Sequence, residues 1–557
     1  MSFKYGIPTV SRRDFLKGGA LGMALVSGAA LAGCDNGGGE QTPAGGDSGS
    51  KGVGIAVATA PITLDPLAAL DTVSMTFISQ GLECLFEKDA EGEIKPAACE
   101  SYEVSDDQLT WTFTLRDAAW SNGDPVVADD FICSWQRNAQ ADSGVADFQY
   151  QIEMAAIKNY AAVLDGSADV SELGISAPDD KTIVIELEHP VPFMLDLLSF
   201  TPWAPVNRAF REEKGDMFGI TKDDQIYNGP FTVTQYDSAA NTFVLTKNEG
   251  YWDVDNVALD TVTFQVIPET QQAVMAYESG TVDYVELTGD LVAQYQDNEA
   301  FGTWDGQFNY YLMMNTTREG MNNENFRRAI ACAINREDIC SSILKDGSEP
   351  VQQMIMKGLF FNKAGEDFAE ASPQPNGYDL EQAQQFWDAA QAETDVREFT
   401  LLFDQDKDFT QDACAYIQDT VQKALPGLTI NLEATPKKSR TDRAQSGDFD
   451  VCLWGWGPDY ADPTAILAMY ESNHPSNYSR WVDEEFDTLY EQANSTDAGD
   501  ADARWDELMR CNEICSTRAV SIPIFQTGLC TLTRPEVTGM GHHITGTQYF
   551  CKYMDKA

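Results

Sequence analysis

The residues best suited to bind a ligand lie in one short segment, 454–463, which reads WGWGPDYADP. It places two indoles, a carboxylate and a Gly-Pro turn directly after a predicted strand, and loops in such positions commonly carry function. In a closed, water-poor cleft the carboxylate of Asp459 would be costly unless it met a cation. From the residues alone, a solvated loop carboxylate is the alternative interpretation of Asp459.

The neighbours of Asp459 have different expected roles. Trp456 is predicted to contact ligand, with a core position as the alternative. Trp454 alternates with Trp456 and therefore shares its strand face. For Trp454, a ligand contact and a core position are equally supported by the sequence. Asp462 is interpreted as structural, because Asp-Pro before the sequence TAIL (464–467) is typical of a helix N-cap followed by proline.

The sequence contains few of the motifs that are typical of an enzyme or of a metal site. It contains no Gly-x-Ser-x-Gly, His-Glu-x-x-His or Cys-x-x-Cys motif, and only four histidines. Carboxylates are so abundant in this sequence that a pair of them is no evidence for a catalytic site. We therefore expect no catalytic residue, no metal and no cofactor, and a secreted hydrolase stays a remote alternative. The twelve cysteines are expected to be mostly small core residues.

The N-terminus predicts export and lipid anchoring. Arg12 and Arg13, followed by Phe-Leu-Lys, resemble a twin-arginine export signal, and the uncharged run 18–32 is too short to span a hydrocarbon core of about 30 Å. The sequence LAGC, which ends at Cys34, resembles a lipobox, so Cys34 is expected to be acylated. The alternative is a chance Arg-Arg pair before a buried helix. We predict a signal peptide at 1–33 and a flexible tether at 34–51.

The remaining chain, roughly 500 residues, is long enough for two or three domains. With 88 acidic against 37 basic residues and a net charge of −51, it would repel nucleic acid and mildly favour cationic ligands. A highly soluble surface is the simpler interpretation of that charge. No nucleic-acid partner is expected.

The elements that must position the site alternate between strands and helices. Alternating apolar residues predict strands at 109–115 and 262–266, whereas 3.6-residue periodicity predicts helices at 325–339 and around 505–509. A further helix is expected at 270–279, stopped by Gly280. The class is therefore α/β or α+β.

Motifs spread over nearly the whole chain resemble the extracytoplasmic solute-binding proteins of peptide ABC transporters, the oligopeptide- and dipeptide-binding class. In order, they are TLDP (63–66), GLECLF (81–86), LTWTFTLR (109–116), WSNGDPV (120–126), ADDF (128–131), SWQR (134–137), NGPF (228–231), NEGYWD (248–253), NFRRAI (325–330), NREDI (335–339), FDV (449–451) and GWGPDYADP (455–463). Any one could arise by chance, but their shared order is specific.

The resemblance implies an α/β, two-lobed, periplasmic-binding-protein-like (class II) fold with an extra subdomain in the first lobe. The implied boundaries are 52–83, 201–308 and 528–557 for lobe I, 84–200 for the inserted subdomain, and 309–527 for lobe II. The chain would cross between lobes near Phe308 and Thr527, where a few residues could absorb lobe rotation.

In this family the aspartate that matches Asp459 pairs with the α-ammonium of the ligand, and Trp456, Trp454 and Tyr460 belong to the same implied site. A basic residue often stands three positions before the matching tryptophan, but here that position is Leu453. Arg440 and Arg443 are the remaining candidates for the carboxylate end, and Arg443 is included in the predicted site. Either arginine is alternatively a solvated loop charge.

The implied function is to capture peptides by lobe closure and to deliver them to an ABC permease and its ATPase. The protein would act as a monomer, held outside the cytoplasm at the membrane by the lipid on Cys34. Because relatives of this fold also take nickel complexes, haem or sugars, the same transport role with non-peptide cargo is the alternative.

Overall fold

A computed structural model describes residues 50–557 apart from 70, 141–151, 153, 238 and 240. The predicted signal peptide, with Arg12 and Arg13, lies outside the described residues. So do Cys34 and all of the predicted tether except Ser50 and Lys51. The described residues belong to the unit that begins at Ser50.

The largest sheet has eleven strands and mixes parallel with antiparallel pairing. In spatial order its strands are β15 (Thr429–Thr435), β14 (Glu398–Asp404), β16 (Val451–Trp456), β12 (Phe301–Met314), β17 (Ser521–Thr533), β11 (Tyr284–Leu287), β1 (Gly52–Val57), β10 (Thr261–Val266), β9 (Thr242–Lys247) and β8 (Phe231–Asp237), with β13 (Glu349–Pro350) paired to β17. Strands from distant parts of the chain thus meet side by side.

Three smaller sheets accompany it among the residues that the structure describes. They are β4 (Cys99–Val104), β5 (Thr110–Leu115), β7 (Thr182–Glu186) and β6 (Ile175–Asp179) in one sheet, β2 (Phe86–Lys88) with β3 (Ile94–Pro96), and β18 (Val537–Thr538) with β19 (Asp555–Lys556). The four-stranded sheet falls inside 84–200, the segment assigned to the inserted subdomain. The domain boundaries themselves stay predictions.

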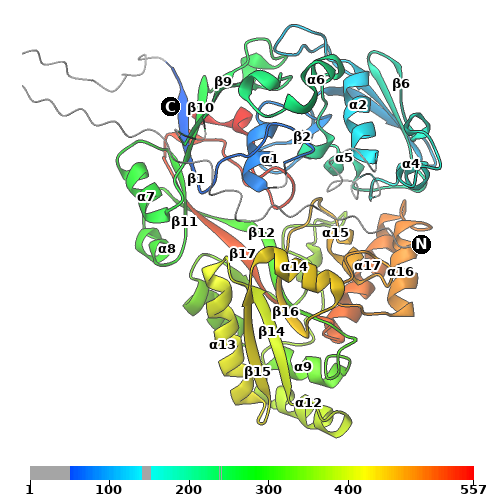
Figure 1. Cartoon of the computed structure of the whole chain (residues 1–557), viewed down its shortest axis with the longest axis vertical. Helices are drawn as coiled ribbons and strands as arrows, with labels where there is room; N and C mark the ends of the chain where they lie inside the picture. The colour runs from blue at the N-terminus through cyan, green and yellow to red at the C-terminus, as the bar shows by residue number, and fades with distance from the viewer. Residues whose placement is uncertain (1–49, 70, 141–151, 153, 238, 240) are drawn as a thin grey trace, which may run out of the picture. The chain divides into compact units, whose positions relative to one another are not determined.

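Helices cover the strands. They are α1 (Thr72–Ser79), α2 (Ala128–Ala139), α4 (Tyr160–Leu164), α5 (Met194–Leu197), α6 (Arg208–Lys214), α7 (Thr270–Glu278), α8 (Asp290–Tyr295), α9 (Glu324–Ala333), α10 (Arg336–Asp338), α11 (Phe368–Ala371), α12 (Leu380–Glu393), α13 (Asp408–Ala424), α14 (Lys437–Ser446), α15 (Thr464–Leu467), α16 (Glu484–Asn494) and α17 (Ala501–Thr517). Helix α13 packs along β14 and β15, as the yellow elements of Figure 1 show, and α16 packs on α17.

The long antiparallel pair β12 and β17 connects the halves of the large sheet. One part of β17 pairs with β11, while β12 continues to pair with β16. Between Asp305 and Asn309 the register shifts, and there Thr527 Oγ1 accepts a hydrogen bond from the Phe308 amide (3.2 Å) and donates one to the Phe308 carbonyl oxygen (3.1 Å). The two predicted crossing points therefore lie opposite each other at an irregularity, which locally bends a strand.

Several local predictions are confirmed. Strand β10 buries Val262 and Phe264, and α7 ends just before Gly280, whose φ of +81° is the left-handed conformation expected there. The helix predicted at 325–339 is interrupted, because Ile334 is extended and the Asn335 side chain caps a new turn at α10. Asn335 is itself a favoured N-cap residue, so the start signal for the second helix overrides the apolar periodicity.

The cysteines that the structure describes, eleven in number, are all buried and free of disulfides. Cys511 and Cys515 lie four residues apart on α17. The prediction of small core residues is confirmed for this part of the chain.

One buried carboxylate should make stability fall as the pH rises. Glu83 accepts hydrogen bonds from the Trp252 indole (2.9 Å) and the Tyr251 hydroxyl. Burial, assisted by the charge of Glu87, raises the pKa of Glu83 from 4.5 to about 8. Between these values the folded state keeps a proton that the unfolded state releases, so the free energy of unfolding decreases with pH.

Between pH 5 and 8, we expect the free energy of unfolding of wild type to fall by about 1–3 kcal/mol more than that of Glu83→Gln. The neutral amide of this variant keeps an acceptor for Trp252. Urea unfolding at each pH measures this difference. The exposed Glu249→Gln should follow wild type. Parallel pH profiles for wild type and Glu83→Gln would contradict the assignment.

Candidate functional site

The loop after β16 lies against the irregular stretch of β12. Trp456, the last residue of β16, pairs with Asn309 on β12. A side chain at Gly457 would place its Cβ 2.6 Å from the Gln307 carbonyl oxygen and 3.2 Å from the Phe308 ring, so only glycine fits there. Two residues further along, Asp459 is half-buried. The sequence-predicted ligand loop is thus held at the crossing between the predicted lobes.

The two tryptophans share one face of β16, as predicted, but differ in burial. Trp454 is 7% exposed, packs edge-on against Tyr478 and lies 4.3 Å below the Arg440 guanidinium. Trp456 is half-buried and donates its indole N–H to the Ala465 carbonyl oxygen (3.0 Å). Trp454 is therefore a core residue that supports the strand, and Trp456 is the more accessible of the two.

Tyr460 and Ala461 join this loop to a distant segment. Tyr460 is 2% exposed and stacks on Phe193 with ring centroids 4.2 Å apart. The Ala461 amide donates to Asp196, which also pairs with Lys88 (2.7 Å). Both contacts connect the predicted lobe II to the segment assigned to the inserted subdomain. The Tyr460 ring is buried in the first of them and is not part of an open surface.

A cavity of about 260 Å³ opens beside the irregular stretch of the large sheet. Its wall includes the end of β1 (56–57) with Ala58, the shifted stretch of β12 (305–308), Gly528 of β17, Glu286 of β11 and a C-terminal segment that contains His542. Strands β1 and β11 pair at Ile55 and Tyr284, and the residues that follow this pair on both strands line the cavity. Because Gly457 touches Gln307 and Phe308, the ligand loop and the cavity share a wall.

A family model described as "Bacterial extracellular solute-binding proteins, family 5 Middle" matches residues 93–478, more than half of the chain. The chain belongs to this family. The resemblance shown by the sequence motifs and the predicted two-lobed α/β fold are thereby confirmed.

Relatives of this family 5 protein are similar along nearly their whole length. It is 28% identical over 522 residues to a dipeptide-binding protein of Lactococcus lactis subsp. cremoris, covering 91% of this chain and 94% of that protein. The substrate-binding domain of an oligopeptide ABC transporter from Bacillus anthracis matches with a TM-score of 0.77 and 31% identity, covering 92% and 99% of the two chains. Listeria monocytogenes OppA bound to peptide matches with a TM-score of 0.77 and 29% identity, covering 92% and 100%.

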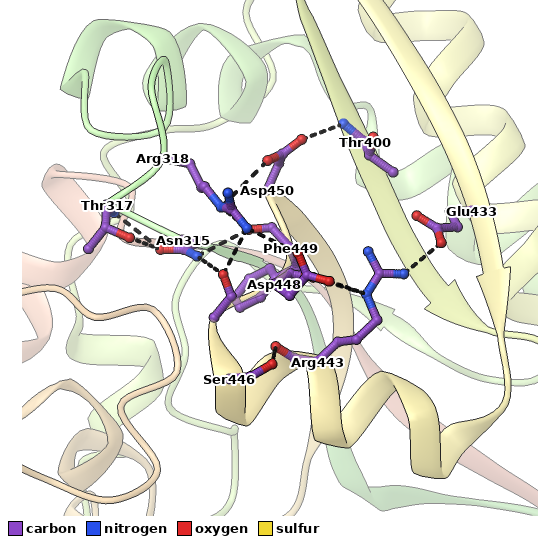
Figure 2. A network of polar contacts seen from close by, with 11 residues as sticks. Asn315, Thr317, Arg318, Thr400, Glu433, Arg443, Ser446, Asp448, Phe449 and Asp450 are labelled. Carbon is purple, nitrogen blue, oxygen red and sulfur yellow. Dashed lines mark hydrogen bonds and ion pairs between the residues drawn. The ribbon is translucent and has the colours of Figure 1, made fainter.

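The structure does not bring Arg443 to the other predicted residues of this family 5 protein. Figure 2 shows it on α14, where it donates to Glu433 Oε1 (2.6 Å) and to the Asp448 carbonyl oxygen (3.0 Å). The hydrogen bond to Glu433 raises the pKa of Arg443. Asp448 lies shortly before the start of β16, and the ligand loop begins after the end of β16. Arg443, which contacts Asp448, therefore lies at the opposite end of this strand from the ligand loop.

Sequence reasoning missed the acidic wall of the cavity in this family 5 protein, Glu286 and Asp305. Alternation along β11 does predict a polar face that contains Glu286. No local signal, however, shows that this face lines a cavity rather than bulk solvent.

Two absences hold for the part of the chain that the structure describes. No group of three or more His, Cys, Asp or Glu side chains is arranged to hold a metal ion. No helix among these residues is both long and apolar enough to cross a membrane.

Proposed function

We propose that this protein is an extracytoplasmic receptor that captures peptides between two lobes and delivers them to an ABC permease and its ATPase. The observation that carries the proposal is the cavity at the irregular stretch of the large sheet, beside the loop that contains Asp459. The likeness to a peptide-bound OppA structure and to a dipeptide-binding protein supports peptides as the cargo.

The cavity suits an extended ligand. The strand register shifts on β12 between Asp305 and Asn309. Strands β1 and β11 line the cavity just after their pair at Ile55 and Tyr284. An extended peptide beside such an irregular stretch of strand can form main-chain hydrogen bonds, which do not depend on its sequence. Asp459 would pair with the α-ammonium of the peptide, and Trp456 would contact its first residues.

Closure would use contacts from both predicted lobes. The stacked rings of Phe193 and Tyr460 and the Ala461–Asp196 hydrogen bond are candidates for contacts made in the closed form. A ligand that touches both lobes shifts the population toward that form, which the permease would recognise.

The remaining parts of the proposal rest on the sequence. Cys34 would carry the lipid that anchors the protein to the membrane, and Arg12 and Arg13 would direct export. Trp454 and Tyr460 would support the site from the core, and the protein would act as a monomer without catalysis.

Native purification followed by mass spectrometry tests the function. The full chain, purified without denaturant and then denatured, should release a pool of peptides. Release of a metal complex, haem or sugar instead would favour the alternative cargo. Hydrolysis of added peptides by the purified protein would overturn the binding role.

A further inference from the structure

The cavity at the irregular stretch of the sheet is lined by acidic but not by basic side chains. Two carboxylates, Glu286 and Asp305, line it together with His542 and His543, whereas no lysine or arginine is found among its described lining residues. Two lysines near the cavity have other partners: Lys407, which lies 6.0 Å from the centre of the Phe308 ring, donates to the Tyr310 hydroxyl (2.8 Å), and Lys88 pairs with Asp196 (2.7 Å).

Glu286 has neutral partners. It accepts hydrogen bonds from the Gln548 amide (3.2 Å) and, at the edge of the usual range, the Tyr284 hydroxyl (3.4 Å). Its side chain is exposed at the cavity, but protein atoms lie on its other sides, and their partial desolvation of the carboxylate raises the pKa of Glu286. A desolvated carboxylate without a counter-ion is costly, and a cation placed beside it removes much of that cost.

The histidines do not supply that cation. Burial and the neighbouring His543 lower the pKa of His542 to about 3, so its ring is neutral near pH 7. The ring packs between Tyr284 and Trp304, with centroids 5.7 Å and 4.7 Å away. Burial also lowers the pKa of His543. His542 therefore adds a neutral aromatic ring, and no counter-ion, to the wall that contains the two carboxylates.

We infer that this cavity receives a lysine or arginine side chain of the ligand, with Glu286 as the principal counter-ion and Asp305 as the second. This inference rests on the peptide-binding function proposed above. The α-ammonium at Asp459 is a separate contact, because Asp459 is not part of the cavity lining. The net charge of −51 adds a general attraction for cationic peptides.

Calorimetric titration of the full chain with matched peptides tests the inference. The probes are alanine tri- and pentapeptides in which each position in turn carries lysine or its uncharged analogue norleucine. At one position the lysine peptide should bind at least tenfold more tightly than the norleucine peptide. Glu286→Gln should reduce that ratio to about threefold or less, and Asp305→Asn should reduce it by a smaller factor.

The exposed Glu249→Gln makes the same charge change and should leave the ratio as in wild type. Equal binding of lysine and norleucine peptides at every position would overturn the inference while leaving the proposed function standing. A lysine preference that persists in both Glu286→Gln and Asp305→Asn would also overturn it. Failure of every peptide to bind would overturn the proposed function as well.

Discussion

Asp459→Asn is expected to weaken the binding of a free-amine peptide about 100-fold. The substitution keeps the shape of the side chain but removes the charge that the proposed site offers to the α-ammonium. Breaking a buried charge pair costs about 3–5 kcal/mol, and a half-buried site such as this one lies near the lower end. The fold should hardly change, because the loop is tied down by other residues, among them Gly457 and Asp462.

The measurement compares each peptide with its N-acetylated form. Wild type should strongly prefer the free amine, whereas Asp459→Asn should bind both forms about equally. Asp106→Asn makes the same charge change on the exposed turn between β4 and β5 and should keep the preference. If Asp459→Asn retained the full preference for the free amine, Asp459 would not belong to the site.

Elements with strong local signals could be predicted from the sequence. The alternation at β10 and the glycine after α7 determine local conformation through nearest neighbours, so they needed no tertiary information. At α9 two local signals compete, and the cap at Asn335 ends a helix that the apolar periodicity would have continued. Which signal dominates depends on packing that a single sequence does not display.

The site could be predicted only where it is local. The segment 454–463 brings an indole, a tight glycine contact and a carboxylate together within a few residues. Arg443 shows the limit, because a position shortly before a strand in the sequence lies at the far end of that strand in space. Glu286 and His542 are 256 residues apart in the sequence, yet both line one cavity. Their proximity follows from the strand order of the sheet and not from any motif.

Arg504→Met is expected to lower the free energy of unfolding by about 3–5 kcal/mol. Arg504, on α17, donates two hydrogen bonds to Asp462, at 2.7 Å and 2.8 Å, and both side chains are at most 3% exposed. Burial alone would lower the pKa of Arg504, but the paired carboxylate raises it. Removing the guanidinium leaves a buried carboxylate without its cation, next to the proposed ligand loop.

Urea unfolding measures the loss, and the same helix offers a matched control. Arg510 makes a comparable two-point contact with Glu485, at 3.0 Å and 2.8 Å, but the two side chains are 46% and 48% exposed. Arg510→Met should therefore cost only about 0–1 kcal/mol. Equal losses in the two variants would contradict a special role for the buried pair.

The double variant separates the charge of Asp462 from its structural role. Asp462 Oδ1 also accepts hydrogen bonds from the Thr464 amide (3.0 Å) and hydroxyl (2.6 Å), which hold the start of α15. Asp462→Asn keeps an acceptor for these bonds but removes the charge. Combined with Arg504→Met, it should restore at least half of the lost stability, because the main cost of the single variant is the unpaired charge. No recovery would show instead that the loss comes from the packing of the Arg504 stem.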